Sequence, residues 1–501
     1  MRPAADTDLL IVGGGINGAG IARDAAGRGL RVVLVEQGDL GCATSSASSK
    51  LVHGGLRYLE RLEFRLVAEA LGEREVLLRI APHLVSAMRF VLPHSPGMRP
   101  AWMIRLGLLV YDGLASRQML PASETVSLTL PPYSPSLKTV YKRGYAYSDC
   151  QVDDSRLVIA NARSAHEAGA RIMPRTKFLS AQREGEHWKA RIRGDAGDTY
   201  VVAHALVNAT GPWADQVLGL IDVRPPAKKL KLVQGSHIVV PNLYDGERAF
   251  VRQNNDGRVV FVYPYEGNTL IGTTEVEISD GPDTCQASPA EKEYLCAAAN
   301  RYFNRELRPE HVLWSYCGVR ALVDDGAASP SQVSRDYELE CDAPPGNTPL
   351  LTVYGGKITT YRKLAERVLE KLAPHLPRLG SPWTAGASLP GGDFPAGGRQ
   401  ACVDNLQARY PALSPTLISQ LFRRHGTLTE EVLGPTRIEK DLGTHFGAQL
   451  YAQEVDYFRT HEWAHEAEDV LWRRTKAGLH LSLEQQDVLR TYLNQSTLGH
   501  R

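Results

Sequence analysis

The feature that most constrains the fold is a glycine triplet between a short apolar run and a helical stretch. Gly13, Gly15 and Gly18 form a G-x-G-x-x-G pattern directly after the apolar residues LLIV. A second apolar run, RVVLV, follows the helical stretch and ends at Glu36. A strand, a glycine turn, a helix and a second strand in so short a segment predict a βαβ unit, and therefore a parallel sheet with a right-handed crossover.

This unit predicts a dinucleotide site. The first glycine allows a tight turn, the second lets the backbone approach a pyrophosphate, and the third lets the helix pack closely on the strand. Backbone amides at the helix N-terminus favour the negative phosphates. Glu36 is placed to accept hydrogen bonds from the hydroxyls of the adenosine ribose. The pattern by itself does not decide between FAD and NAD.

The residues after Glu36 favour the longer cofactor. An NAD-binding unit would usually continue into its next helix, whereas this chain has a run of short hydroxyl side chains followed by Gly54 and Gly55. Such a run can follow an extended cofactor and donate to its phosphate and ribityl oxygens. An ordinary solvated loop has the same composition. The hydroxyl residues are Thr44, Ser45, Ser46, Ser48 and Ser49.

Later segments indicate two further parts. Strand-like runs at 229–240, 257–264 and 268–274 are joined by close turns, which predicts an antiparallel sheet and hence a second lobe. A connector rich in proline and glycine, 381–398, precedes a region that is helical in pattern to its end. We expect that region to form a separate helical domain.

Composition and local motifs exclude several classes of protein. The formal net charge of +1 gives no field that would attract nucleic acid. No uninterrupted run of apolar residues is long enough to span a membrane, and the first residues lack the pattern of a signal peptide. None of the seven cysteines is spaced as a redox or metal motif, so we expect free, reduced thiols in a cytoplasmic protein. His461 and His465 match HExxH, but we interpret them as part of a charged helix face and expect no metal.

One stretch makes the sequence recognisable. ATSSASSKLVHGGLRYLE (43–60) resembles the FAD-dependent glycerol-3-phosphate dehydrogenases, which belong to the amino-acid-oxidase-like flavoprotein superfamily. The resemblance covers nearly the whole chain, with the motifs in the family's order. Ala321 stands where the family usually has proline, and Glu275 where it usually has aspartate. Further matching segments are EFRLVAEAL (63–71), LVNATGPWAD (206–215), GSHIVV (235–240), GVRALVDD (318–325) and GGKITTYRKLAE (355–366).

The resemblance implies an α/β fold: a Rossmann-like FAD-binding domain with an inserted antiparallel-sheet substrate domain and a C-terminal helical domain. It implies oxidation of sn-glycerol 3-phosphate to dihydroxyacetone phosphate by hydride transfer to FAD, with electrons passed to a membrane quinone. The expected boundaries are 1–385 for the FAD-binding domain (1–80, 145–220 and 318–385) with its inserted lobe (81–144 and 221–317), and 386–501 for the helical domain.

The substrate's phosphate dianion needs several hydrogen-bond donors in one cleft. The resemblance points to Arg57, Tyr58, Arg320 and Lys357. His237 is the candidate base for the substrate hydroxyl, because an imidazole titrates near neutrality. Arg320 could instead depress the pKa of that hydroxyl, with water as the proton acceptor.

We also expect the flavin to contact a second set of residues. Two glycines, Gly355 and Gly356, precede a long amphipathic helical segment, so backbone amides there can face the flavin N1–C2=O edge and stabilise its reduced form. Thr210 and Gly211 end an apolar strand beside the dinucleotide. The expected flavin contacts are His53, Thr210, Gly211, Gly356, Ile358 and Thr359.

Residues 97–120 carry apolar side chains among Arg99, Arg105 and Arg117. Such a face can lie in a bilayer interface, although core packing explains the pattern equally well. The family's quinone acceptor favours peripheral attachment to the inner face of the cytoplasmic membrane.

Three other functions compete with a quinone-linked dehydrogenase. They are an oxygen-using oxidase of the same substrate, an amine or amino-acid oxidase, and a flavin- or lipid-binding regulatory protein. The helical C-terminal domain could form a homodimer contact or bind a regulatory partner.

Overall fold

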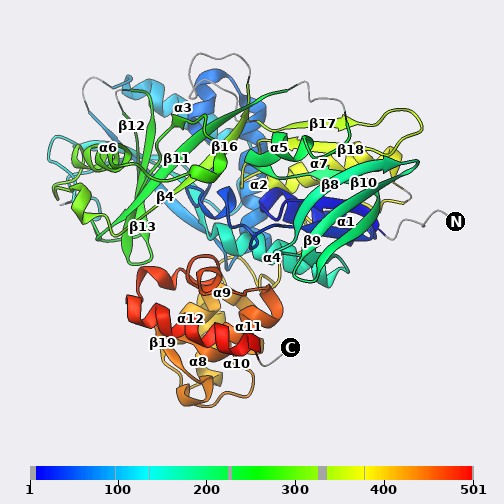
Figure 1. Cartoon of the computed structure of the whole chain (residues 1–501). Coiled ribbons are helices and arrows are strands. Elements are labelled where there is room, and N and C mark those ends of the chain that lie inside the picture. The colour runs from blue at the N-terminus through cyan, green and yellow to red at the C-terminus, as the bar shows by residue number, and fades with distance from the viewer. Residues whose placement is uncertain are drawn as a thin grey trace.

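Two sheet lobes lie side by side above a helical domain in the computed structural model (Figure 1). It describes residues 7–95, 98–134, 136–223, 228–254, 256–324, 336–376 and 378–498. Among these residues no helix is long and apolar enough to cross a bilayer.

The first lobe is built on a mainly parallel sheet in which β1 (Thr7–Val12) lies between β10 and β2. Leu9 and Ile11 pack into the core with α1, α4 and α7, whereas Leu10 and Val12 face β8, β9 and α5. A strand covered on both faces is apolar at every position, which explains the run LLIV. The other elements are α1 (Ile16–Gly27), β2 (Val32–Val35), α2 (Phe64–Ile80), α4 (Asp154–Glu167), β7 (Arg171–Met173), β8 (Lys177–Glu184), β9 (His187–Gly194), β10 (Gly197–Asn208), α5 (Ala214–Leu218), β17 (Glu338–Asp342), β18 (Leu350–Tyr354) and α7 (Tyr361–Leu372).

The second lobe is a curled sheet that is antiparallel except where β12 runs parallel to β4. Its strands include β6 and β16, so residues 143–152 and 314–323 belong to this sheet. The expected boundaries placed most of these residues in the FAD-binding domain. Its elements are β3 (Leu51–Val52), β4 (Val85–His94), α3 (Ala101–Gly113), β5 (Glu124–Ser127), β6 (Arg143–Val152), β11 (Leu230–Val240), β12 (Ala249–Gln253), β13 (Val259–Tyr265), β14 (Asn268–Gly272), β15 (Val276–Glu277), α6 (Pro289–Asn300) and β16 (Trp314–Val323).

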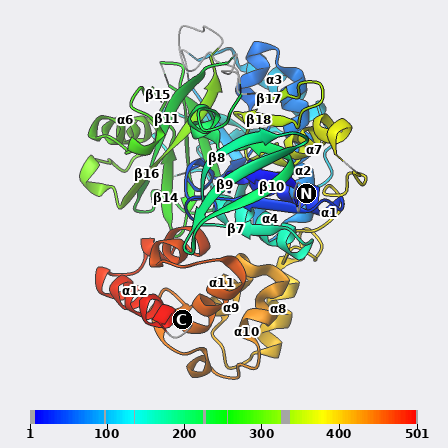
Figure 2. The same ribbon diagram turned by 45° about the vertical axis from the view of Figure 1, so that its right-hand side comes forward.

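The C-terminal domain is helical apart from one small hairpin, β19 (His445–Gly447) with β20 (Leu450–Tyr451), which the sequence pattern did not predict. Figure 2 shows this domain beneath both lobes. Buried ion pairs join it to the first lobe: Arg156 with Glu462, and Arg474 with Asp39. The helices are α8 (Arg399–Arg409), α9 (Pro415–His425), α10 (Thr429–Leu433), α11 (Ala452–Glu462) and α12 (Leu483–Leu498).

Candidate active site

A cleft of about 1290 Å³ lies between the two sheets. It begins at the carboxyl ends of β1, β2 and β10, where ligands bind in open α/β sheets. Every site residue expected from the sequence lines this cleft except Gly18, which lies behind the glycine turn. The fold therefore brings together side chains from segments that are hundreds of residues apart.

The glycine turn has the geometry of a phosphate cradle. Gly13 has a φ of +111°, and a Cβ there would lie 2.6 Å from the carbonyl oxygen of Ala209. A Cβ on Gly18 would overlap the carbonyl oxygen of Gly13. The amide of Ile16, at the start of α1, donates to the Ser45 hydroxyl at 2.9 Å. Only glycine fits these positions, and the turn leaves its backbone lining the cleft at the N-terminus of α1, where an anionic group is favoured.

Glu36 fixes the end of the cleft next to this turn. Its carboxylate accepts hydrogen bonds from the amides of Gly14 at 2.7 Å and Gly38 at 2.8 Å. Burial raises the pKa of the Glu36 carboxyl although both amides oppose that effect. A buried acceptor at the end of β2 fits the ribose of a dinucleotide.

Three residues of the predicted hydroxyl run donate hydrogen bonds within the protein. Thr44 donates to the carbonyl oxygen of Val319 at 2.8 Å, and Ser48 donates to Asp154 at 2.8 Å. Ser46 donates to the carbonyl oxygen of Ala43 at 3.2 Å. These hydrogen bonds hold the run in place along the wall of the cleft.

Two further glycines with positive φ values lie beside the glycine turn and the start of α1. Gly356 has a φ of +103°, and a Cβ there would lie 2.8 Å from the Asn17 side-chain nitrogen. Gly211, after Thr210, has a φ of +57°. Helix α7 begins only at Tyr361, so Ile358 and Thr359 lie in the turn before it. Both residues line the cleft.

His53 is joined to this turn. Its amide donates to the Thr359 hydroxyl at 3.3 Å. Burial, together with the charges of Lys357, Arg57 and Arg74, lowers the pKa of His53 to about 4. The ring is therefore neutral near pH 7 and adds no charge to the cleft.

Three cationic side chains converge in the cleft. Arg320 donates to the Thr273 hydroxyl at 3.1 Å and to the Thr274 carbonyl at 3.4 Å. The Lys357 ammonium lies 4.0 Å from the centroid of the Tyr58 ring. Arg57 pairs with Glu275 at 3.8 Å. Glu275 stands where the family usually has aspartate, so an acidic side chain still lines the cleft at this position. Such a cluster is suited to a phosphate dianion.

His237 lies beside these cations on β11. Its Nε2 lies 2.9 Å from the Ser49 hydroxyl, and its ring stacks on Tyr316 with centroids 4.8 Å apart. Its Nδ1 has no hydrogen-bond partner among the described residues. Burial lowers the pKa of His237 well below its usual range, and the charges of Arg320 and Lys50 act in the same direction. A neutral, oriented imidazole can accept a proton.

Sequence reasoning missed one wall of the cleft. Trp472, from the C-terminal domain, lines it and stacks on Trp314 with centroids 4.7 Å apart. No motif around Trp472 signals this role, because the contact depends on how the C-terminal domain docks.

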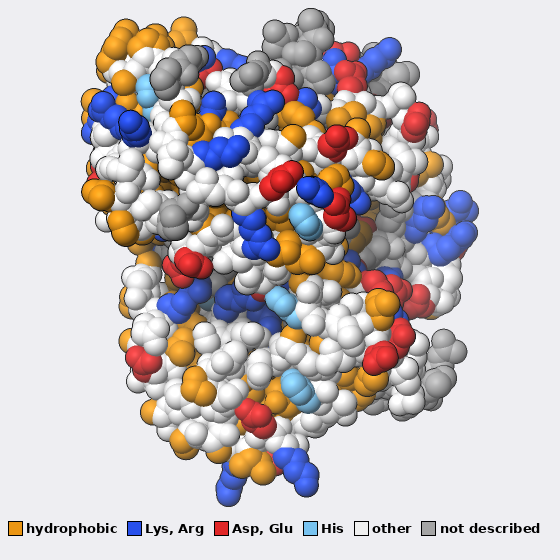
Figure 3. Space-filling view, turned by 90° about the vertical axis from the view of Figure 1, so that its left-hand side faces the viewer, with side chains coloured by type: hydrophobic (Ala, Val, Ile, Leu, Met, Phe, Trp, Pro, Cys, Tyr) orange, Lys and Arg blue, Asp and Glu red, His pale blue; other side chains and the backbone are white. Residues whose placement is uncertain are grey.

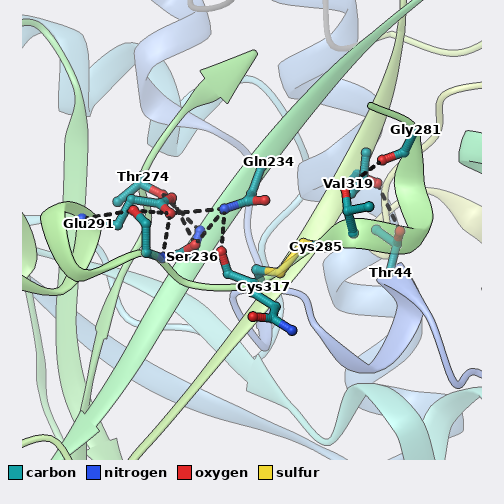
Figure 4. Close-up of a disulfide and its surroundings, with 12 residues drawn as sticks. Thr44, Gln234, Ser236, Thr274, Gly281, Cys285, Glu291, Cys317 and Val319 are labelled. Atoms are coloured by element: carbon teal, nitrogen blue, oxygen red, sulfur yellow. Dashed lines mark hydrogen bonds between the residues drawn. A yellow bond between two sulfur atoms is a disulfide. The ribbon is translucent and has the colours of Figure 1, made fainter. Parts of the chain in front are cut away.

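The expectation of seven free thiols is wrong. Cys285 and Cys317 form a disulfide at the edge of the cleft (Figure 4). The two residues are separated by 32 positions, and the pairing arises because β16 places Cys317 beside the segment that precedes α6. The other five cysteines are free.

The HExxH pattern does not form a metal site. Helix α11 ends at Glu462, and Trp463 is in the left-handed conformation with a φ of +56°. His465 therefore lies beyond the helix that carries His461. Glu462 is buried against Arg156, and the described residues contain no cluster suited to a metal ion.

Two family models match the chain. Residues 8–362 match the FAD dependent oxidoreductase family, and residues 383–494 match the C-terminal domain of alpha-glycerophosphate oxidase. A glycerol-3-phosphate dehydrogenase of Pseudomonas aeruginosa is 50% identical over 99% of this chain and 96% of its own length. A D-erythritol 1-phosphate dehydrogenase of Brucella abortus is 47% identical over 98% of both chains.

A solved structure is also similar over nearly the full length. The glycerol-3-phosphate dehydrogenase of Bacillus halodurans, complexed with FAD, has a TM-score of 0.75 and 26% sequence identity. The similarity covers 97% of this chain and 94% of that one, so it includes the C-terminal domain.

Proposed function

Because this chain belongs to the FAD-dependent glycerol-3-phosphate dehydrogenase family, we propose that it oxidises sn-glycerol 3-phosphate to dihydroxyacetone phosphate by hydride transfer to FAD. The observation that carries the proposal is the convergence of Arg57, Arg320 and Lys357 beside His237 in one cleft. The glycine turns support a fit for FAD, since both Gly13 and Gly356 line the cleft with positive φ values, where a Cβ would meet neighbouring protein atoms and only glycine keeps this backbone.

In this proposal, six residues that line the cleft have roles in the reaction. Arg320 and Lys357 hold the substrate phosphate, with Arg57 adding charge and Tyr58 packing under the Lys357 ammonium. FAD, when bound, supplies the acceptor for the hydride that leaves C2. His237 takes the proton of the C2 hydroxyl, and the contact between its Nε2 and the Ser49 hydroxyl orients the ring.

The neutral state of His237 favours its role as the base. An imidazolium would repel Arg320 and could not accept the proton, whereas burial keeps this ring neutral. The other arrangement, in which Arg320 polarises the hydroxyl and water takes the proton, does not need His237.

A polyol phosphate with a longer carbon chain is the second candidate substrate, because a D-erythritol 1-phosphate dehydrogenase is 47% identical to this chain. The same cations would hold either phosphate. The two substrates differ in one additional CHOH group, which the cleft must accommodate.

The test is an anaerobic visible spectrum of the FAD-loaded protein before and after addition of each phosphate. Bleaching of the flavin by sn-glycerol 3-phosphate supports the proposal, and faster bleaching by D-erythritol 1-phosphate moves the assignment to the second substrate. Bleaching by glycine or sarcosine alone would favour an amine oxidase. Oxygen uptake in proportion to product would indicate an oxidase in place of a quinone-linked enzyme.

The electron acceptor in this proposal is a membrane quinone, reached by peripheral attachment to the inner face of the cytoplasmic membrane. An exposed apolar patch on α3 and the adjoining turn supports it: Trp102 is 65% exposed, Leu106 53% and Leu62 72%. Hydrophobic side chains gather at the upper left of the face in Figure 3. An apolar helix face of this kind can enter a bilayer interface.

The arginines near this patch contribute less than their sequence pattern indicates. Arg99 pairs with Glu60 at 2.8 Å, Arg105 donates to the Ser123 hydroxyl at 2.7 Å, and Arg117 pairs with Asp112 at 2.6 Å. Attachment therefore depends on apolar insertion more than on attraction to anionic lipids.

Leu106→Glu combined with Leu109→Glu should prevent co-sedimentation with phospholipid vesicles, because both side chains are exposed on α3. Leu108 is fully buried and is no part of this surface. Leu483→Glu, at a residue 76% exposed on α12, is the matched control and should leave binding unchanged. Equal binding by the double variant and the wild type would contradict attachment through α3.

A further inference from the structure

A buried carboxylate lies behind the cleft at the start of α6. Glu291 is 6% exposed and follows Ser288, the residue that caps this helix. Its Oε2 accepts hydrogen bonds from the amide of Ser288 at 3.0 Å and from the hydroxyl of Ser288 at 2.9 Å. These contacts form a capping box, which by itself stabilises a helix end.

Helix capping accounts for only part of the contacts of this carboxylate. Its Oε1 accepts from the hydroxyl of Thr274 at 2.6 Å and from that of Ser236 at 2.8 Å, and Oε2 also accepts from the Gln234 amide at 2.9 Å (Figure 4). Burial raises the pKa of the Glu291 carboxyl, but the hydrogen bonds outweigh it and the pKa lies below the usual range. Glu291 is therefore a charged acceptor for donors from β11 and from the segment after β14.

Each partner of Oε1 adjoins a catalytic group, one along the chain and the other through a hydrogen bond. Ser236 immediately precedes His237. Thr274 accepts from Arg320 through its carbonyl oxygen, and Thr273 accepts from the same guanidinium through its hydroxyl. The two segments are also bound directly, because the Ser236 amide donates to the Thr274 hydroxyl at 2.8 Å.

A second set of contacts fixes the segment that carries Glu291. Gln234 donates to the carbonyl oxygen of Gln286 at 2.9 Å. The adjacent Cys285 is bonded to Cys317, which lies three residues before Arg320 on β16. Hydrogen bonds therefore link the start of α6 to β11, and the disulfide links the segment before α6 to β16.

We propose that Glu291 is a positioning residue that holds His237 and Arg320 in their catalytic arrangement through Ser236, Thr273 and Thr274. The inference rests on the proposed function, because it assigns Glu291 to the oxidation of a polyol phosphate. Glu291 does not line the cleft, so it acts only through these residues. Small displacements of such groups have large effects on rate, and buried networks of this kind set their positions.

The test compares Glu291→Ala with Ser288→Ala in the full-length, FAD-loaded protein. Ser288→Ala removes the helix cap and leaves both contacts of Oε1, so it is matched for loss of capping. The rate of anaerobic flavin reduction by sn-glycerol 3-phosphate is measured as a function of concentration, below the Tm of every variant. We expect the reduction rate divided by the apparent Kd to fall about 10-fold or more in Glu291→Ala and to change less than about 2-fold in Ser288→Ala.

Glu291→Gln gives an independent result, and decides the test if Glu291→Ala does not fold. It keeps the shape of the side chain but turns one acceptor into a donor, so it should lose activity in the same direction. Flavin content should stay at the wild-type level in both variants. Equal rates in the Glu291 variants and Ser288→Ala would overturn the inference. Failure of the wild-type protein to be bleached would instead contradict the proposed function.

Discussion

Arg320→Ala tests the assignment of the phosphate site most directly. Arg320 lies half-buried on β16, and hydrogen bonds to Thr273 and Thr274 restrict its guanidinium. A hydrogen bond to a charged group contributes about 1.5–3 kcal/mol net. Since ~1.4 kcal/mol is a factor of ten, the substitution should lower kcat/KM about 10- to 150-fold for sn-glycerol 3-phosphate. Lys357 and Arg57 remain, so we expect partial loss.

The assay uses the substrate as its own control. kcat/KM is measured with an artificial electron acceptor for sn-glycerol 3-phosphate and for glycerol, which has no phosphate. Arg320→Ala should reduce the preference for the phosphorylated substrate and leave the rate with glycerol within about 2-fold, because glycerol has no phosphate for Arg320 to bind. Arg320→Lys should recover part of the loss, since it restores the charge without the fork of donors.

Two results would refute this reasoning. An equal fall with both substrates would mean that Arg320 acts on the hydroxyl or on the arrangement of the cleft. An unchanged preference would place the phosphate elsewhere. Flavin absorbance of each purified variant must match the wild type, because loss of FAD would lower both rates alike.

Three further predictions concern the base, the cofactor cradle and the domain interface. His237→Ala should slow flavin reduction about 10²- to 10⁴-fold with little change in substrate affinity, and an unchanged rate in the variant would remove His237 as the base. Because the pKa of His237 is lowered, the wild-type kcat should not fall as the pH drops from about 8 through about 6.5. Gly18→Ala should abolish FAD retention on gel filtration, because its Cβ would overlap the Gly13 carbonyl, and a fully loaded variant would show that the turn can move. Burial opposes ionisation of Glu462, but the Arg156 guanidinium outweighs it and lowers the pKa of this carboxyl from 4.5 to about 2. The ionised Glu462 therefore contributes ~3 kcal/mol to the free energy of unfolding above about pH 4.5, and this contribution is lost as the pH falls towards 2. Glu462→Gln should lower the Tm near neutral pH and flatten that dependence in thermal melts between about pH 3 and 6, whereas a parallel shift at every pH would contradict the assignment.

Much of the cofactor site was predictable because it is local in sequence. The turn from Gly13 to Gly18 needs glycine at each position where a Cβ would meet backbone, and that requirement is visible as a pattern. Glu36 follows the second strand at a fixed distance along the chain. The order of such local motifs along the chain predicted the FAD-dependent oxidoreductase fold, and the family model confirms it.

The cationic residues of the cleft were identified by resemblance, since no local pattern distinguishes Arg320 from a solvated surface arginine. Their convergence depends on strand register: Arg320 lies opposite Val233 on β11, and His237 lies opposite Tyr316 on β16. A shift of one residue would turn each side chain to the other face of the sheet.

Sequence alone determined the dinucleotide turn, the order of the lobes and the family, because each depends on residues close together or on motifs in a fixed order. Only the tertiary structure decided that Leu108 is buried while Leu109 is exposed, that Cys285 meets Cys317, and that Trp472 lines the cleft. These facts depend on which faces pack together when distant segments meet. Packing of that kind is a property of the whole chain, and no short pattern contains it.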